Sequence, residues 1–255
     1  MTAKKTIIIT GASSGLGAAL ATGYANITTR LFLFGRSKER LAYIASICKT
    51  QYAEVTTISA DVKDQQLMHL EITKICKKYK IDIIIACAGI SAGTLGGPET
   101  ASQSKTIFCT NMDGALHTIM PALPFMIQNK SGNIVIISSM AGLIGLSSSP
   151  SYSASKAAIK TFGDALRGYL QQFEVKVNVV IPGYIDTPMT RVNNFPMPFK
   201  ISAKDAAKII IRGVQKNKAI IAFPLIMYIL LRILSVLPAI LIDYINSKIP
   251  GKQAL

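Results

Sequence analysis

The stretch Thr6-Ile7-Ile8-Ile9-Thr10-Gly11-Ala12-Ser13-Ser14-Gly15-Leu16-Gly17 decides the fold of this chain. Its apolar run predicts a buried strand, and glycines spaced G-x3-G-x-G follow where a helix should begin. Glycine lets the backbone turn sharply and lets a pyrophosphate approach, while the helix start offers free N–H groups to that phosphate. Glycine also serves in ordinary turns, but strand, turn and helix occur here in the order that a dinucleotide site requires.

The rest of the chain alternates short β-branched runs with helix-length segments. Strands are expected over residues 6–10, 31–34, 55–59, 81–86, 133–138, 175–181 and 218–223. Helices are expected to include residues 38–51, 65–79, 151–173 and 203–216. This alternation predicts right-handed βαβ units, and the uniformly apolar strands indicate a sheet covered on both faces. We therefore expect an α/β fold, a Rossmann-type doubly wound parallel sheet of about seven strands.

Composition narrows the class of protein. The chain has 255 residues, of which 28 are Lys or Arg and 13 are Asp or Glu. Half of all residues are apolar and only 16% are charged, which excludes a disordered chain. Aromatic residues make up 7% and no zinc-finger or RNA-binding signature occurs, so nucleic acid is not the expected partner. An anionic membrane surface or a phosphorylated cofactor explains the basic excess better. Four scattered cysteines form no metal pattern and fit a reduced, cytoplasmic compartment.

The segment Gly35-Arg36-Ser37-Lys38 follows the second expected strand. A protein that binds NAD places a carboxylate there, on the ribose hydroxyls, whereas this chain places a guanidinium and a hydroxyl. Arginine forms paired, charge-assisted bonds to phosphate, so Arg36 and Ser37 favour NADP over NAD. The alternative is that Arg36 only solvates a loop.

Tyr152 and Lys156 are four residues apart and therefore lie on one face of the expected helix. A nearby cation favours the ionised form of a phenol, whose pKa is otherwise about 10. Ser139 follows an expected strand at the sheet edge where ligands bind, and its hydroxyl can hold a substrate oxygen.

Together these residues resemble the short-chain dehydrogenase/reductase family over roughly residues 5–220. The matching motifs are Thr10 to Gly17, Asp61-Val62, Ala86 to Gly89, Asn111, Ser139, Tyr152 to Lys156 and Pro182 to Thr187. The resemblance implies that Tyr152 is the general acid or base, that Lys156 lowers its pKa and that Ser139 polarises the carbonyl. It also implies that Asn111 holds a water in a proton relay, that Ile185 and Thr187 fix the nicotinamide and that Asp61 and Val62 contact adenine. The expected cofactor contacts are Gly11, Ser13, Ser14, Gly15, Leu16, Gly17, Arg36, Ser37, Asp61, Val62, Ala88, Gly89, Tyr152, Lys156, Pro182, Gly183, Ile185 and Thr187.

Two features depart from the family pattern. The usual Asn-Asn-Ala-Gly is Ala86-Cys87-Ala88-Gly89 here, so the side-chain amides that brace the sheet edge are missing, although the retained glycine should still admit the cofactor. The chain also continues beyond the usual end, which leaves a homodimer or other oligomer open. We divide it into a catalytic domain, residues 1–223, and an apolar helical tail, residues 224–255.

The tail needs a nonaqueous neighbour. On a helical wheel Arg232, Ser235, Asp243 and Asn246 share one stripe, Pro238 would kink the helix, and the remaining circumference is apolar. Ten basic and two acidic residues follow Thr190. Peripheral attachment of residues 224–248 to a membrane, as two short helices or a hairpin that leaves Arg232 at the surface, ranks first, a lid or dimer face second and a membrane span third.

The expected function is reduction of a lipophilic ketone, or oxidation of the corresponding secondary alcohol, with NADP(H) preferred over NAD(H). Residues 189–217 are expected to form a mobile flap over the substrate. The alternative is a protein that binds the cofactor, as a sensor or while tethered to a membrane, without catalysis.

Overall fold

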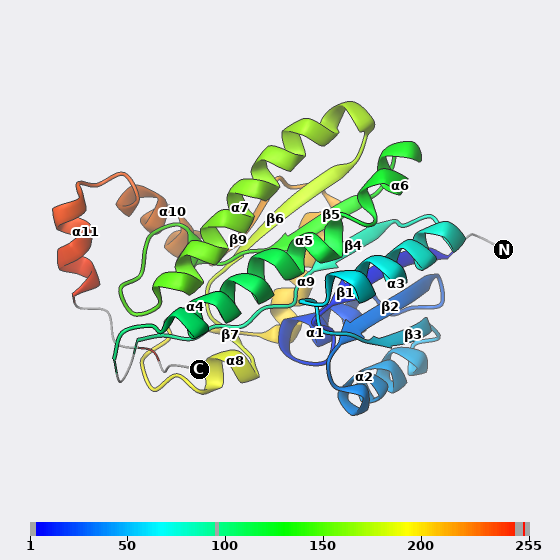
Figure 1. The fold of residues 1–255 in the computed structure, drawn as a ribbon, viewed down its shortest axis with the longest axis horizontal. Helices are drawn as coiled ribbons and strands as arrows, with labels where there is room; N and C mark the ends of the chain where they lie inside the picture. Colours follow the sequence, from blue (N-terminus) through cyan, green and yellow to red (C-terminus); the bar gives the residue numbers. More distant parts are fainter. Residues whose placement is uncertain (1–3, 95–96, 248–251, 253–255) are drawn as a thin grey trace.

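A computed structural model describes residues 4–94, 97–247 and 252. Seven parallel strands form its central sheet in the order β3-β2-β1-β4-β5-β6-β9 (Figure 1). The strands are β1 (Lys5–Thr10), β2 (Thr29–Gly35), β3 (Glu54–Ser59), β4 (Ile83–Ala86), β5 (Asn133–Ile137), β6 (Lys176–Pro182) and β9 (Ile220–Phe223). The predicted doubly wound sheet is confirmed, and each predicted strand agrees with the observed one to within two residues at either end.

Helices cover both faces of the sheet (Figure 1). The longer ones are α1 (Gly15–Tyr24), α2 (Lys38–Thr50), α3 (Gln65–Lys78), α4 (Ala101–Phe108), α7 (Pro150–Leu170), α9 (Ala203–Gln215), α10 (Leu225–Leu234) and α11 (Ala239–Asn246). The shorter ones are α5 (Gly114–Ile119), α6 (Leu123–Gln128) and α8 (Pro188–Arg191), with a π-helical turn over Cys109–Asp113 and 3-10 turns over Met140–Gly142 and Gln171–Phe173. A separate pair of short strands consists of β7 (Ile185–Asp186) and β8 (Ile201–Ser202).

Alternation within each strand divides the core into two layers. Ile7 and Ile9 of β1 pack with α1, α2 and α9 on one face, while Ile8 packs with α3, α5 and α7 on the other. Successive side chains of a strand point to opposite faces, and both faces are covered here. This explains why the central strands are apolar over most of their length and why the sequence shows no polar face for them.

The chain adds its strands first to one side of β1 and then to the other. Strands β2 and β3 lie on one side of β1, whereas β4, β5, β6 and β9 lie on the other. The connections after β1 and β4 therefore lead to opposite sides, which leaves a crevice at their carboxyl ends, where doubly wound sheets bind ligands. Residues Gly11 to Gly17 follow β1 at this edge.

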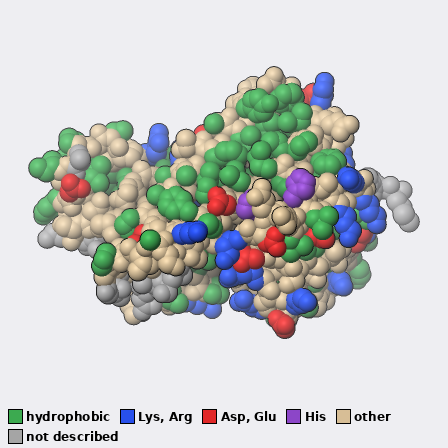
Figure 2. Space-filling model, in the orientation of Figure 1, with side chains coloured by type: hydrophobic (Ala, Val, Ile, Leu, Met, Phe, Trp, Pro, Cys, Tyr) green, Lys and Arg blue, Asp and Glu red, His purple; other side chains and the backbone are tan. Residues whose placement is uncertain are grey.

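The tail folds as two short helices. Residues 235–238, with Pro238, separate α10 from α11, so the tail has the two short helices expected for peripheral attachment and not the continuous kinked helix expected for a span. Among the described residues no helix has the length and apolar character to cross a bilayer. Figure 2 shows hydrophobic side chains gathered at the end of the molecule where α11 lies. Whether this surface meets lipid or a second subunit stays a prediction, as does the division into two domains.

Candidate active site

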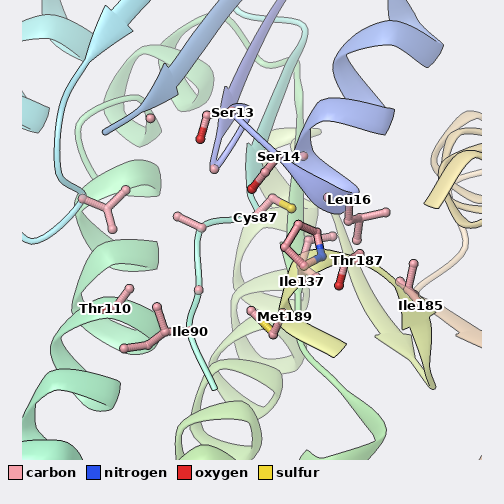
Figure 3. Close-up of a pocket in the computed structure, with 18 of the residues that line it drawn as sticks. Ser13, Ser14, Leu16, Cys87, Ile90, Thr110, Ile137, Ile185, Thr187 and Met189 are labelled. Carbon is pink, nitrogen blue, oxygen red and sulfur yellow. The ribbon is translucent and has the colours of Figure 1, made fainter. Parts of the chain in front are cut away.

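A cavity of about 290 Å³ opens at the carboxyl edge of the sheet, beside β1 and β4. Figure 3 shows side chains around it from three segments: Ser13, Ser14 and Leu16 of the glycine turn, Cys87 after β4, and Ile185, Thr187 and Met189 after β6. These segments lie far apart in sequence. Parallel strands bring them together because their carboxyl ends meet at one edge.

Glycine is required in the turn after β1 for two reasons. Gly11 has φ of +69°, a left-handed conformation, and a Cβ there would lie 2.8 Å from the Cα of Ala88. A Cβ at Gly17 would overlap the carbonyl of Gly11. Ser14 caps α1 without a side-chain hydrogen bond, so the first N–H groups of the helix are available to an anion at the cavity.

Thr10 joins the end of β1 to the end of β4. Its hydroxyl donates to the carbonyl of Ile85 at 3.3 Å and accepts from the backbone N–H groups of Cys87 and Ala88 at 3.2 and 3.4 Å. These bonds fix the backbone that leads to Gly89. A Cβ at Gly89 would lie 3.1 Å from Oδ1 of Asn111 and 3.4 Å from Nζ of Lys156, so only glycine leaves this passage open.

Tyr152 and Lys156 both line the cavity from α7, as their spacing predicts, and Ser139 faces the same cavity. Nζ of Lys156 lies 5.9 Å from the centroid of the Tyr152 ring and donates to the carbonyl of Ile137 at 2.9 Å. Burial lowers the pKa of Lys156 to about 8. Burial raises the pKa of Tyr152, and the hydrogen bond with Ser139 opposes that rise.

Asn111 does not line the cavity, although its predicted partners lie next to it. It is buried in the π-helical turn, where Oδ1 accepts from the N–H of Ile90 at 2.8 Å. Its Nδ2 donates to the carbonyl of Ile90 and to the hydroxyl of Ser155, both at 3.0 Å. Asn111 therefore fixes the backbone of Ile90, which does line the cavity, to α7. The relay role stays a prediction.

The other end of the cavity is basic. Arg36, Arg40, Asp61 and Val62 line it, and within the described part of the chain neither arginine forms an ion pair. Ser37 is not among the lining residues. Its hydroxyl caps α2 by accepting from the N–H of Arg40 at 3.2 Å, and it donates to Glu39 at 2.9 Å. A contact from Ser37 to a phosphate would therefore require these bonds to rearrange.

The segment after β6 covers the remaining side. Thr187 caps α8, the Thr187 N–H donates to the hydroxyl of Thr190 at 3.1 Å, and that hydroxyl donates to the carbonyl of Ile185 at 2.6 Å. The predicted flap is too long at its carboxyl end. Residues 203–215 form α9, which packs in the core against α1, so any movable segment ends near residue 200.

Sequence reasoning missed several residues that line the cavity. They are Gly35, Arg40, Ala60, Cys87, Ile90, Thr110, Ile137, Ser138 and Pro188, whereas Met189 and Thr190 belong to the predicted flap. Most are sequence neighbours of motif residues, and their contribution is backbone or packing, which no motif records. Arg40 carried a usable signal, because it is a second arginine close after Arg36, in the first turn of an expected helix.

The lining residues fit a dinucleotide. Close backbone approach at Gly11, Gly17 and Gly89 and the free N–H groups of α1 suit a pyrophosphate, and the two arginines suit a further phosphate. Lys156 keeps two donor positions beyond its bond to Ile137, enough to hold a ribose hydroxyl.

Comparison with known proteins agrees with this geometry. A family model described as short chain dehydrogenase matches residues 5–196. An uncharacterized oxidoreductase of Myxococcus xanthus is 33% identical over 240 residues, which cover 94% of this chain and 95% of that protein. One from Staphylococcus saprophyticus is 33% identical over 218 residues, covering 83% and 92%.

Two solved structures share the fold. One is a putative NAD(P) dependent gluconate 5-dehydrogenase from Beutenbergia cavernae with bound NADP, with a TM-score of 0.79 and 23% identity, covering 87% of this chain and 95% of that one. The other is a short chain dehydrogenase from Mycobacterium paratuberculosis bound to NAD, with a TM-score of 0.76 and 21% identity, covering 86% and 94%.

Proposed function

Because this chain belongs to the short-chain dehydrogenase family of oxidoreductases, we propose that it interconverts a ketone and a secondary alcohol with NADP(H) as cofactor. One observation carries this proposal: Tyr152, Lys156 and Ser139 line the same cavity as the glycine turn after β1. A protein that only bound the cofactor would have no chemical use for a phenol, an ammonium and a hydroxyl at this end of the cavity.

The side chains divide the work of proton transfer. When bound, the nicotinamide supplies or accepts the hydride. Ser139 donates a hydrogen bond to the substrate oxygen, and the Tyr152 hydroxyl gives that oxygen its proton during reduction. Burial raises the pKa of Tyr152 and so keeps the phenol protonated for this role at neutral pH. The Lys156 ammonium stabilises the negative charge that develops on the phenol oxygen as the proton leaves.

The preference for NADP rests on Arg36 and Arg40. Both line the end of the cavity that follows β2, where neither is ion-paired with another described residue. Glu39, the acid nearest to them in sequence, accepts a hydrogen bond from Ser37 and does not line the cavity. Two unpaired guanidinium groups favour a 2′-phosphate over a free ribose hydroxyl.

Apolar side chains favour a lipophilic substrate. Ile90, Ile137, Ile185 and Met189 line the cavity together with the polar residues, so the body of the substrate would meet hydrocarbon while its carbonyl meets Ser139 and Tyr152.

Replacing Tyr152 by Phe tests the proposal. Tyr152→Phe should reduce kcat for ketones by at least about a hundred-fold, since proton transfer by a positioned side chain contributes 10²–10⁴-fold, while NADPH still binds. Tyr169→Phe is the matched control, because Tyr169 is exposed on the same helix. Turnover of 2-octanone and of methyl 2-oxooctanoate is followed by NADPH absorbance, and cofactor binding by NADPH fluorescence. Wild-type rates in Tyr152→Phe would refute the assignment.

A further inference from the structure

The tail brings the end of the chain back to the part of the active site that contains Tyr152. Helix α10 packs Met227, Tyr228 and Leu231 against Met140 and Ile181, beside the end of β6. Its opposite side carries exposed apolar residues, among them Ile226 and Ile229. This arrangement anchors the first half of the tail to the sheet edge next to the cavity.

The end of α11 is fixed to the loop that precedes α7, and Figure 1 shows α11 beyond the start of α7. Nδ2 of Asn246 donates to the carbonyl of Gly145 at 3.0 Å, and its backbone carbonyl accepts from the hydroxyl of Ser147 at 3.1 Å. The N–H of Ser147 donates to Oδ1 of Asn246 at 3.5 Å. Residues about a hundred positions apart are thereby joined within a few residues of Tyr152.

Lys252 lies beside the Tyr152 ring. Its ammonium donates to the hydroxyl of Ser91 and lies 5.2 Å from the centroid of the Tyr152 ring. The backbone of Lys252 approaches Gly93 so closely that a Cβ at Gly93 would overlap it. Ser91 and Gly93 belong to the loop after β4, which continues from the lining residues Cys87 to Ile90. The Tyr152 ring therefore has one cation from α7 and a second from the tail.

Among the described residues, no carboxylate balances the charge on Lys252. No acidic group within the described ranges lies within ion-pairing distance of its ammonium, and Ser91 takes one of its three donor positions. Burial lowers the pKa of Lys252 to about 8, so it is mostly charged at neutral pH. A partly buried cation that no described carboxylate neutralises costs free energy, which an anionic ligand would recover.

We propose that Lys252 binds an anionic group of the substrate, a carboxylate or a phosphate, attached close to the carbonyl that Tyr152 and Ser139 hold. The substrate is then an amphiphilic ketone with an acidic head and an apolar body. This inference rests on the proposed function, and it makes Lys252 the residue that selects among ketones. The competing role for Lys252 is steric: its side chain would obstruct the space beside Tyr152 and weaken the binding of every ligand equally.

Matched pairs of probes separate charge from shape. 2-Oxooctanoate is compared with its methyl ester, and dihydroxyacetone phosphate with dihydroxyacetone, at low ionic strength because salt screens the interaction. Dissociation constants are measured by titration calorimetry on the full chain saturated with NADP⁺, and kcat/KM is measured with NADPH. Wild-type protein should bind at least one anion about ten-fold or more tightly than its neutral partner, as expected for a charge-assisted hydrogen bond. The larger ratio identifies a carboxylate or a phosphate as the preferred group.

Three variants assign the preference to one side chain. Lys252→Met should abolish it, Lys252→Arg should retain most of it, and Lys216→Met should behave as wild type, because Lys216 is exposed at the end of α9. Equal binding of anion and ester by wild-type protein, or no binding of any probe, overturns the inference. So does a Lys252→Met variant that binds both members of a pair more tightly by the same factor, which is the result expected of the steric role.

The binding and turnover results separate this inference from the proposed function. Turnover that depends on Tyr152 without a preference for anions leaves the proposed function standing and removes the role of Lys252. Anion preference in binding without turnover of any probe supports the role of Lys252 and removes the proposed function.

Discussion

Reduction of a neutral ketone should lose rate as the pH rises, because Lys156 loses its charge. The pKa of Lys156 is lowered to about 8, whereas that of Tyr152 is raised, so the ammonium deprotonates before the phenol does. Once neutral, Lys156 no longer stabilises the charge that develops on the phenol oxygen. The descending limb of the pH profile therefore belongs to Lys156.

The size of this loss follows from the pKa of Lys156. With a pKa of about 8, roughly nine-tenths of the molecules carry the ammonium at pH 7 and roughly one-tenth at pH 9. If only the charged form is active, kcat/KM falls about ten-fold between pH 7 and pH 9, and the logarithmic slope approaches −1 above pH 8.

The assay is the pH profile of kcat/KM for methyl 2-oxooctanoate with NADPH, from pH 6 to pH 9. Lys156→Arg should remove the limb from this range, because a guanidinium keeps its proton. Lys252 also has a lowered pKa of about 8, so Lys252→Met is measured in parallel and should keep the limb. A limb that persists in Lys156→Arg, or that vanishes in Lys252→Met, refutes the assignment to Lys156.

Two further substitutions test the cofactor site. Gly11→Ala should cost more than about 2 kcal/mol of folding free energy, because φ is +69° and the new Cβ would lie 2.8 Å from the Cα of Ala88. Urea unfolding measures the loss of stability and NADPH fluorescence the loss of cofactor affinity. The control is Gly145→Ala, whose added Cβ meets nothing within 4 Å. Unchanged NADPH affinity in Gly11→Ala would contradict the role of this turn in binding the pyrophosphate. Arg36→Leu should raise KM for NADPH by about ten-fold or more and leave KM for NADH nearly constant, since the lost bonds involve only the 2′-phosphate. Steady-state kinetics with both cofactors check this, with Lys49→Leu at the exposed end of α2 as control. An equal rise in KM for NADPH and NADH would show that Arg36 does not determine the preference.

Local patterns were sufficient to predict the sheet. Runs such as Ile7-Ile8-Ile9 and residues 134–137 are apolar at every position because both faces of the sheet are covered, and such a run can be recognised from the segment alone. The same holds for Tyr152 and Lys156, since four residues span one helical turn whatever the helix packs against. The glycine turn was predictable because steric restrictions act on each residue separately.

Contacts between distant segments were not predictable in this way. The sequence does not predict the hydrogen bonds from Cys87 to Thr10 and from Ile90 to Asn111, or the packing of α9 against α1. Each depends on which elements become neighbours after the sheet has formed.

The tail shows the difference most plainly. The sequence by itself determined that residues after Pro224 are too apolar to remain in water as a lone helix, since hydropathy and helical periodicity are properties of the segment. Only the tertiary structure decided where α10 ends and α11 begins, that Asn246 forms hydrogen bonds to the loop before α7, and that Lys252 lies beside Tyr152. The reason is physical: a hydrogen bond between residues about a hundred positions apart depends on the path of the whole chain, and no local propensity encodes that path.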